Sequence, residues 1–286
     1  MALGSAGLSG TGGSHDKYTP EIWSKRIQSA FEKNTITKQY CLDLTELLSG
    51  QGGDVIHTPK LANRAAASRS LTSFAQVTPA GATEDEFTMN VQTWMIDPEF
   101  VSDALSIQTK LFMKSQIDGK MQQSLAEAFD TSLLATYTDF TTTLGDNTGA
   151  TAASPDDIFD ALEQLDTNAC PKSDRVIILS PKQFWAFVKS DVIPSGDYFS
   201  EKAKESGRIP VLGGVPVVVS QNLPSHANGG KVNLVMHKEG IAYAIPQAPR
   251  VRSQQTLDHL GETIVGDCLY GAKVFRANAG IVVYGK

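Results

Sequence analysis

The side chains in this sequence that are best suited to metal binding or catalysis belong to five histidines and three cysteines. The histidines are His15, His57, His226, His237 and His259. A helical metal-binding pair needs two ligands one turn apart, and no two of these histidines have that spacing. The cysteines are Cys41, Cys170 and Cys268, and no two of them form a C-x-x-C pair. The pattern therefore predicts no metal site, no cofactor and no disulfide framework, but buried thiols in a reducing compartment.

The sequence also lacks the short motifs that mark catalytic and nucleotide sites. It contains no Walker A loop, no G-x-G-x-x-G, no H-E-x-x-H and no G-x-S-x-G. Ser14-His15-Asp16 are adjacent, whereas a catalytic triad needs side chains that converge from separate elements. Gly213-Gly214 lie between two strand-like segments and not before a helix, so they predict a tight turn and not a phosphate loop. We predict no catalytic residue.

Two groups of carboxylates have a simpler explanation than metal binding. The first group is Asp97, Glu99 and Asp103, and the second is Asp156, Asp157 and Asp160. Each group follows or surrounds a proline at the start of a segment that is predicted to be helical. Acidic side chains are stabilising at a helix N-terminus, where the backbone N–H groups point outward. We interpret both groups as helix starts.

The elements that would have to position a site include a middle α/β lobe, residues 150–245. Ser154-Pro155 and Ser180-Pro181 each predict the start of a helix. Apolar runs at 176–179 and 215–220 predict buried strands. Ligands bind at the strand ends of such lobes. The polar residues near those ends are Ser180, Ser220, Gln221 and Asn222. An α/β enzyme with a site in this lobe is therefore only a remote alternative.

Upstream of this lobe, the sequence predicts a long hairpin followed by a long helix. Residues 54–95 combine two strand-like stretches with a polar connection, and an isolated ribbon of this kind needs support from a partner subunit. Lys60, Arg64 and Arg69 in this region form either a solvated tip or a charged contact with that subunit. Residues 99–140 are predicted to be mainly helical. The apolar stripe of this helix consists of Met121, Leu125, Ala128, Phe129, Leu133 and Tyr137.

Composition and charge limit the remaining function classes. The chain has 286 residues and a formal net charge of -6. No basic patch stands out, which argues against sequence-specific binding of nucleic acid. No apolar run reaches the roughly 18 residues of a membrane span, and the N-terminus lacks the regions of a signal peptide. The Gly- and Ser-rich start predicts a mobile arm, and residues 20–33 predict a short amphipathic helix.

In their order along the chain, these parts resemble the major capsid (coat) proteins of tailed double-stranded-DNA bacteriophages. The segment that these proteins carry ahead of the shell body is represented here by PEIWSKRIQSAFEKN, which resembles it, and their extended loop by GGDVIHTPKL and FTMNVQTWMID. IDPEFVSDALSIQTK and QSLAEAFDTSLL resemble the approach to their spine helix and the helix itself. DRVIILSPKQFWAFVKS and LGGVPVVVSQNLP resemble their axial lobe, and LYGAKVFRANAGIVVYG resembles their C-terminal return to the peripheral lobe.

The resemblance implies an α+β fold of the tailed-phage major capsid protein type. The implied parts are an N-terminal arm with a short helix (1–53), an extended loop hairpin (54–97), a peripheral domain with a spine helix (98–149 and 246–286) and an axial domain (150–245). It implies a structural protein without an active site, whose copies form pentamers and hexamers. These would build the icosahedral virion head around the phage genome.

The resemblance also implies partners. They are further copies of the chain, a portal protein and packaged double-stranded DNA bound without sequence specificity, with assembly in the bacterial host cytoplasm and no membrane. Whether a decoration protein binds outside stays open. Because few residues precede the first predicted helix, we expect a separate scaffolding protein. We predict no covalent crosslink between subunits.

Two questions stay open at the level of the sequence. An encapsulin-like nanocompartment shares this fold but encloses an enzyme cargo, so it is an alternative to the phage capsid. Trp23, Trp94 and Trp185 are candidates for buried anchors at subunit contacts, or else they are ordinary core residues.

Overall fold

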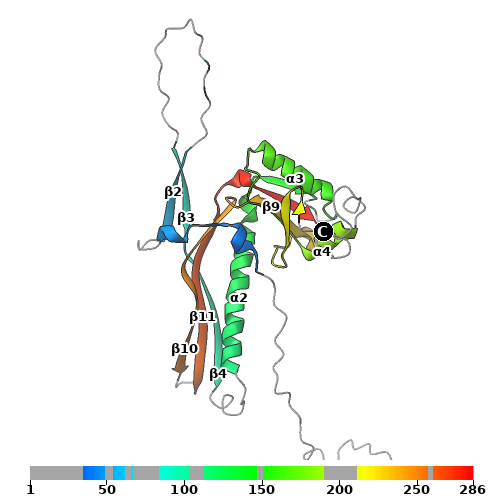
Figure 1. Ribbon diagram of the computed structural model, residues 1–286. Coiled ribbons are helices and arrows are strands. Elements are labelled where there is room, and N and C mark those ends of the chain that lie inside the picture. Colours follow the sequence, from blue (N-terminus) through cyan, green and yellow to red (C-terminus); the bar gives the residue numbers. More distant parts are fainter. Residues whose placement is uncertain are drawn as a thin grey trace, which may run out of the picture. The chain divides into compact units, whose positions relative to one another are not determined.

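The computed structural model describes residues 35–48, 54–61, 66, 68, 84–102, 113–146, 148, 151–189, 211–256 and 260–285. All of them belong to one compact unit, Glu32–Lys286. The predicted amphipathic helix at 20–33 and the predicted arm before it lie outside the described residues. Helices, 3-10 turns and two mixed sheets alternate along the chain (Figure 1), which is the predicted α+β class.

The first part is an antiparallel hairpin of β2 (Val55–Leu61) and β3 (Glu84–Asn90). Period-two alternation places Ile56, Phe87 and Met89 on its buried side. They pack with Ala242 and Ala244 of the same chain, so the base of the ribbon is supported internally. That the ribbon also lies against a partner subunit stays a prediction.

The second part is a four-stranded sheet in the order β1-β10-β11-β4. Its strands are β1 (Leu42–Asp43), β4 (Thr93–Ser102), β10 (Ile241–Thr256) and β11 (Gly261–Val274). The expected helix start around Asp97 and Glu99 is wrong, because β4 pairs with β11 along its whole length. A proline is tolerated there because β4 is an edge strand, where a missing N–H leaves no ladder partner unpaired.

Helix α2 (Met113–Ala135) packs on one face of this sheet (Figure 1). A Cβ on Gly266 of β11 would meet Leu125 at 3.2 Å and Met121 at 3.3 Å, so the helix approaches the strand closely at a residue without a side chain. Within the predicted stripe, Met121, Leu125, Phe129 and Leu133 are buried. The helical periodicity is thus confirmed, although the helix begins at Met113 and not near residue 99.

The third part is a six-stranded sheet in the order β5-β12-β9-β6-β8-β7. Its strands are β5 (Thr142–Gly145), β6 (Arg175–Leu179), β7 (Val211–Leu212), β8 (Val215–Val219), β9 (Lys231–His237) and β12 (Gly280–Gly285). Helices α3 (Pro155–Thr167) and α4 (Pro181–Lys189) belong to the same part. The predicted strand at 176–179 is confirmed, and every residue of β6 is buried.

Short 3-10 turns complete the described elements. They are η2 (Thr37–Tyr40), η3 (Thr45–Leu48), η4 (Thr136–Asp139), η5 (Ala227–Gly229) and η7 (Ala277–Ala279).

One apolar cluster joins α2 to both sheets, through Leu133 of the helix, Tyr270 of β11 and Leu234 of β9. The division of the chain into four domains stays a prediction.

Candidate subunit interface

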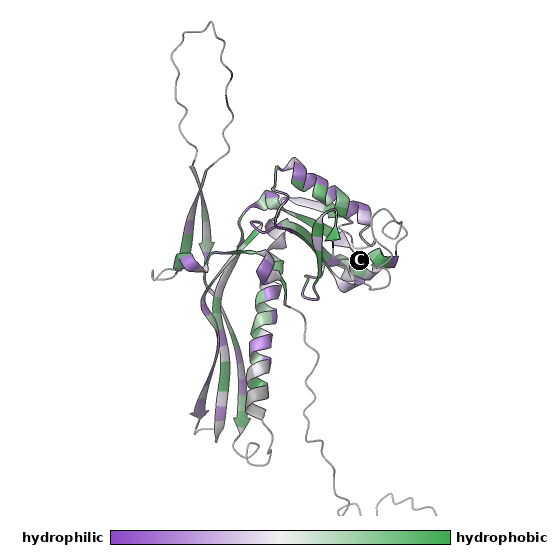
Figure 2. Cartoon of the chain, in the orientation of Figure 1, coloured by the Kyte–Doolittle hydropathy of each residue, from purple (hydrophilic) through white to green (hydrophobic). Residues whose placement is uncertain are grey.

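The outward face of β4 exposes large apolar side chains. Trp94, Ile96 and Phe100 are 67%, 58% and 46% exposed. They occupy even positions of the strand and therefore share one face, whereas Met95 points to the side that α2 covers. Figure 2 shows apolar stretches along this sheet, and β4 is its edge strand. We call Trp94, Ile96 and Phe100 the β4 face.

Exposure of this kind is unusual for a subunit that functions alone. An apolar patch on an open sheet edge is a site for pairing or aggregation unless something covers it. Of the candidate anchors, Trp94 and Trp185 are exposed in the subunit, the latter by 51%, so they are not ordinary core residues. Trp23 lies outside the described residues.

A buried carboxylate orients the tryptophan of the β4 face. Both oxygens of Asp267 accept hydrogen bonds from Arg250, at 2.9 and 3.0 Å, and Oδ2 accepts one from Nε2 of Gln247 at 2.7 Å. The indole N–H of Trp94 donates to the same oxygen at 3.4 Å. The hydrogen bonds from Arg250, and then those from Gln247 and Trp94, hold the pKa of Asp267 well below its usual range, although burial opposes the shift. The hydrogen bond to Asp267 therefore fixes the orientation of the Trp94 ring within the subunit.

The polar residues of the remote enzyme alternative have structural roles. The backbone N–H of Ser180 donates to Oδ1 of Asn233 at 2.9 Å, and its hydroxyl accepts from the backbone N–H of Gln183. The hydroxyl of Ser220 accepts from the backbone N–H of Asn222 at 3.2 Å. Gln221 is exposed. These contacts fix the ends of β6 and β8, so the described geometry gives no nucleophile paired with a base.

Other residues singled out in the sequence also receive definite places. Gly213 and Gly214 join β7 to β8 with φ of 58° and 82°, which confirms the tight turn. Ser154 and Asp157 form a reciprocal capping box at the start of α3, with Asp156 in its first turn, which confirms that helix start. Asp160 follows within the helix. Asp103 lies outside the described residues.

The described histidines lie apart from one another. His57 contacts Glu86 at 2.5 Å on the hairpin, His226 stacks on Tyr284, and buried His237 accepts from the backbone N–H of Glu239. His15 and His259, like Ser14 and Asp16, lie outside the described residues, as do Arg64 and Arg69. Lys60 belongs to β2. Within the described part of the chain, no cluster of three or more metal-binding side chains is present.

All three cysteines are free, and Cys41 and Cys268 are buried as predicted, whereas Cys170 is partly exposed. Burial, followed by the charge of Asp130, raises the pKa of Cys41 to about 12. Burial also raises the pKa of Cys268. A thiol that stays protonated is a poor nucleophile and a poor metal ligand.

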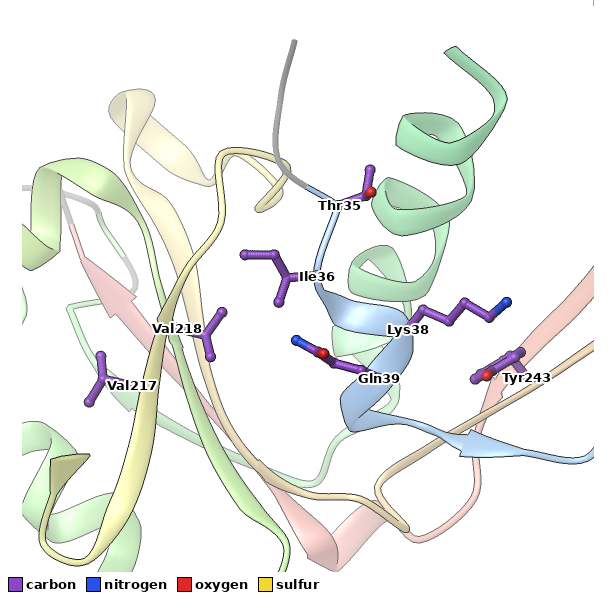
Figure 3. A pocket seen from close by; sticks show the side chains of 7 residues that line it. All are labelled: Thr35, Ile36, Lys38, Gln39, Val217, Val218 and Tyr243. Carbon is purple, nitrogen blue, oxygen red and sulfur yellow. The ribbon is translucent and has the colours of Figure 1, made fainter. Parts of the chain in front are cut away.

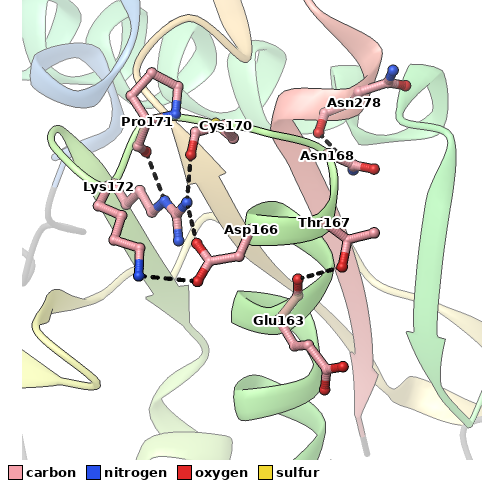
Figure 4. A network of polar contacts seen from close by, with 9 residues as sticks. Glu163, Asp166, Thr167, Asn168, Cys170, Pro171, Lys172 and Asn278 are labelled. Carbon is pink, nitrogen blue, oxygen red and sulfur yellow. Dashed lines mark hydrogen bonds and ion pairs between the residues drawn. The ribbon is translucent and has the colours of Figure 1, made fainter.

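Figure 4 shows a polar network at the turn between α3 and β6. The Arg175 side chain, 4% exposed, contacts Asp166 at 2.6 Å. The same guanidinium donates to the carbonyl oxygens of Cys170 and Pro171 at 2.6 and 2.8 Å. Hydrogen bonding to Arg175, and then to Lys172, lowers the pKa of Asp166. The network holds the end of a helix and is not a reactive centre.

A groove of about 720 Å³ lies between η2, β8 and β10 (Figure 3). Its described lining consists of Thr35, Ile36, Lys38, Gln39, Val217, Val218 and Tyr243. Burial raises the pKa of Tyr243, and the neighbouring Asp43 raises it further. Among these lining residues there is no carboxylate, histidine or cysteine, so the groove does not suggest acid–base chemistry.

No helix in the described part is long and apolar enough to cross a membrane.

A family model identifies the family of this chain. A model of the family described as "phage capsid protein" matches residues 112–283, which is more than half of the chain. A comparison with curated protein sequences gives no match.

Solved structures share the fold at low identity. The structure of Mycobacterium phage Che8 is 20% identical, has a TM-score of 0.80 and covers 93% of this chain and 97% of that one. A capsid structure of cyanophage P-SCSP1u is 19% identical, with a TM-score of 0.77 and coverage of 98% and 96%. The capsid of a native GTA particle is 12% identical, with a TM-score of 0.75 and coverage of 99% of both chains.

The described α+β fold is therefore that of tailed-phage capsid proteins, and the resemblance found in the sequence is confirmed. The capsid is the structural shell of the virion. This chain belongs to the phage capsid protein family.

Proposed function

We propose that this chain is the major capsid protein of a tailed bacteriophage and forms the pentamers and hexamers of an icosahedral head. The observation that carries the proposal is the β4 face, an apolar surface on an edge strand whose tryptophan is held in place by a hydrogen bond to Asp267. Copies related by rotational symmetry bury such a surface repeatedly, and many modest contacts then stabilise a closed particle.

The parts of the chain have distinct roles in this proposal. Residues 54–97 form the extended loop, 98–149 with 246–286 the peripheral domain, and 150–245 the axial domain, behind an arm at 1–53. Covering the β4 face is a task for a neighbouring copy, because the opposite side of this sheet is already occupied by α2.

The proposed partners follow from the task of a phage head. Copies of the chain assemble in the host cytoplasm with a separate scaffolding protein and a portal protein, enclose double-stranded DNA, and can accept a decoration protein. A net charge of -6 does not oppose this role, since packaged DNA carries its own counterions. The chain itself performs structural work and needs no active site or cofactor.

Negative-stain electron microscopy of the purified chain, together with light scattering, tests the proposal. We expect closed particles or rings of five and six subunits, either from the chain alone or with a scaffolding protein supplied. A stable monomer or dimer under both conditions would contradict the proposal. The contents of particles isolated from infected cells separate a phage head from an encapsulin-like compartment, since the first encloses DNA and the second a protein cargo.

A further inference from the structure

Asp130 is a buried carboxylate that joins three parts of the chain. It lies on α2, and the residue is 2% exposed. Its Oδ1 accepts a hydrogen bond from the backbone N–H of Thr37, and its Oδ2 accepts one from Nδ2 of Asn222, each at 2.8 Å. Thr37 begins η2, and Asn222 follows β8. One side chain therefore holds the N-terminal segment, the long helix and the six-stranded sheet together.

Most side chains around this carboxylate are apolar, and Thr35 and Lys38 line a cavity that Asp130 also lines. Phe129 and Leu133 on the same helix, Cys41 of the N-terminal segment and Leu223 beside Asn222 belong to one apolar cluster. A polar or charged group in such a place is stable only where donors meet it. Asp130 can therefore be buried only while both donors keep their native positions. An aliphatic side chain at this place would not depend on those donors.

Both donors sit on well-anchored backbone. On the sheet side, Nζ of Lys231 donates to the carbonyl of Leu223 at 2.9 Å, and the N–H of Val232 donates to the carbonyl of Pro224 at 3.1 Å. On the N-terminal side, the chain continues into β1, which pairs with β10. A displacement of either segment therefore bends or breaks its hydrogen bond to the Asp130 carboxylate.

We propose that Asp130 is a positioning residue that couples the docking of residues 35–40 to the placement of the loop at 220–224. The coupling is reciprocal, because two contacts share one buried carboxylate and the loss of either leaves it undersatisfied. The proposal concerns the subunit itself and does not depend on how subunits assemble. Within a shell, a pull on the N-terminal segment by a neighbour would change the stability of the 220–224 loop.

Hydrogen–deuterium exchange of the full-length protein, read by mass spectrometry, tests the coupling. Asn222→Ala removes the donor on the sheet side alone, yet we expect roughly tenfold faster exchange in residues 37–41 as well as in 220–224, the effect of about one lost hydrogen bond. Asn222→Asp, which opposes two carboxylates, should act in the same direction. The double variant Asp130→Asn with Asn222→Asp exchanges the two groups and should restore exchange at both segments to near the parent rate.

Thr37→Val is the matched control. The Thr37 hydroxyl has no hydrogen-bond partner among the described residues, and the substitution keeps the backbone N–H that Asp130 accepts. Exchange in 220–224 should therefore stay at the parent rate in this variant. Faster exchange confined to 220–224 in Asn222→Ala would overturn the coupling. If that variant does not fold, the decision falls to Asn222→Asp and the double variant, and no restoration in the double variant would also overturn it.

Discussion

Replacing Trp94 by alanine tests the role of the β4 face most directly. Taking roughly 250 Å² for a tryptophan side chain, the exposed fraction of 67% leaves about 170 Å² for burial by a partner. At about 25 cal/mol per Å², full burial contributes up to about 4 kcal/mol. Ordering of the contact and incomplete burial reduce this to about 2 kcal/mol, so the critical concentration for assembly should rise about 30-fold.

The assay is light scattering of assembly across a dilution series, with urea unfolding of the subunit measured beside it. Subunit stability should change by less than about 1 kcal/mol, because the substituted side chain is largely exposed. Trp94→Phe keeps most of the apolar surface and loses the hydrogen bond to Asp267, so it should assemble closer to the parent concentration. Trp185→Ala, on α4, tests the second exposed candidate anchor in the same assay. Unchanged assembly in Trp94→Ala would refute the assignment of the β4 face.

Three further outcomes are expected. Phe129→Leu removes two edge-to-face ring contacts, at centroid distances of 4.9 and 5.6 Å, and should lower the free energy of unfolding by about 1–3 kcal/mol in urea titrations. Phe129→Ala should lower it by about 3–5 kcal/mol, and a loss near zero in Phe129→Leu would show that ring geometry is unimportant. Ser154→Ala, which removes the cap of α3, should lower the stability by about 1 kcal/mol, whereas Ser154→Asp should retain it. Because hydrogen bonds from Arg250 lower the pKa of Asp267, its contribution is present above the unfolded pKa of about 4 and is lost as pH falls below it. Asp267→Asn should flatten the stability profile below about pH 4, and an unchanged profile would exclude this group as its source.

Local sequence signals predicted those elements whose causes are local. Ser154-Pro155 followed by acids specified the start of α3, and the paired glycines at 213–214 specified a turn with positive φ. The stripe from Met121 to Leu133 specified the buried side of α2. In each case the deciding interactions lie within one turn or one short span, so composition and spacing contain the information.

The segment around Pro98 shows where local signals mislead. An acid, a proline and further acids are typical of a helix start, yet this stretch is a strand because it pairs with β11 over ten residues, Thr93 to Ser102. That ladder joins positions more than 150 residues apart in the sequence, and an edge strand accepts the proline. Long-range pairing therefore outweighed the local preference.

The sequence alone determined the family, the fold class, the capped helix α3, the glycine turn and the apolar side of the long helix, because each depends on periodicity, composition or order. Only the tertiary structure decided that Trp94 faces outward above Asp267, and that Asp130 meets both Thr37 and Asn222. The physical reason is that hydrogen bonds between distant segments and the exposure of a strand face follow from which elements come together. No local pattern along the chain contains that information.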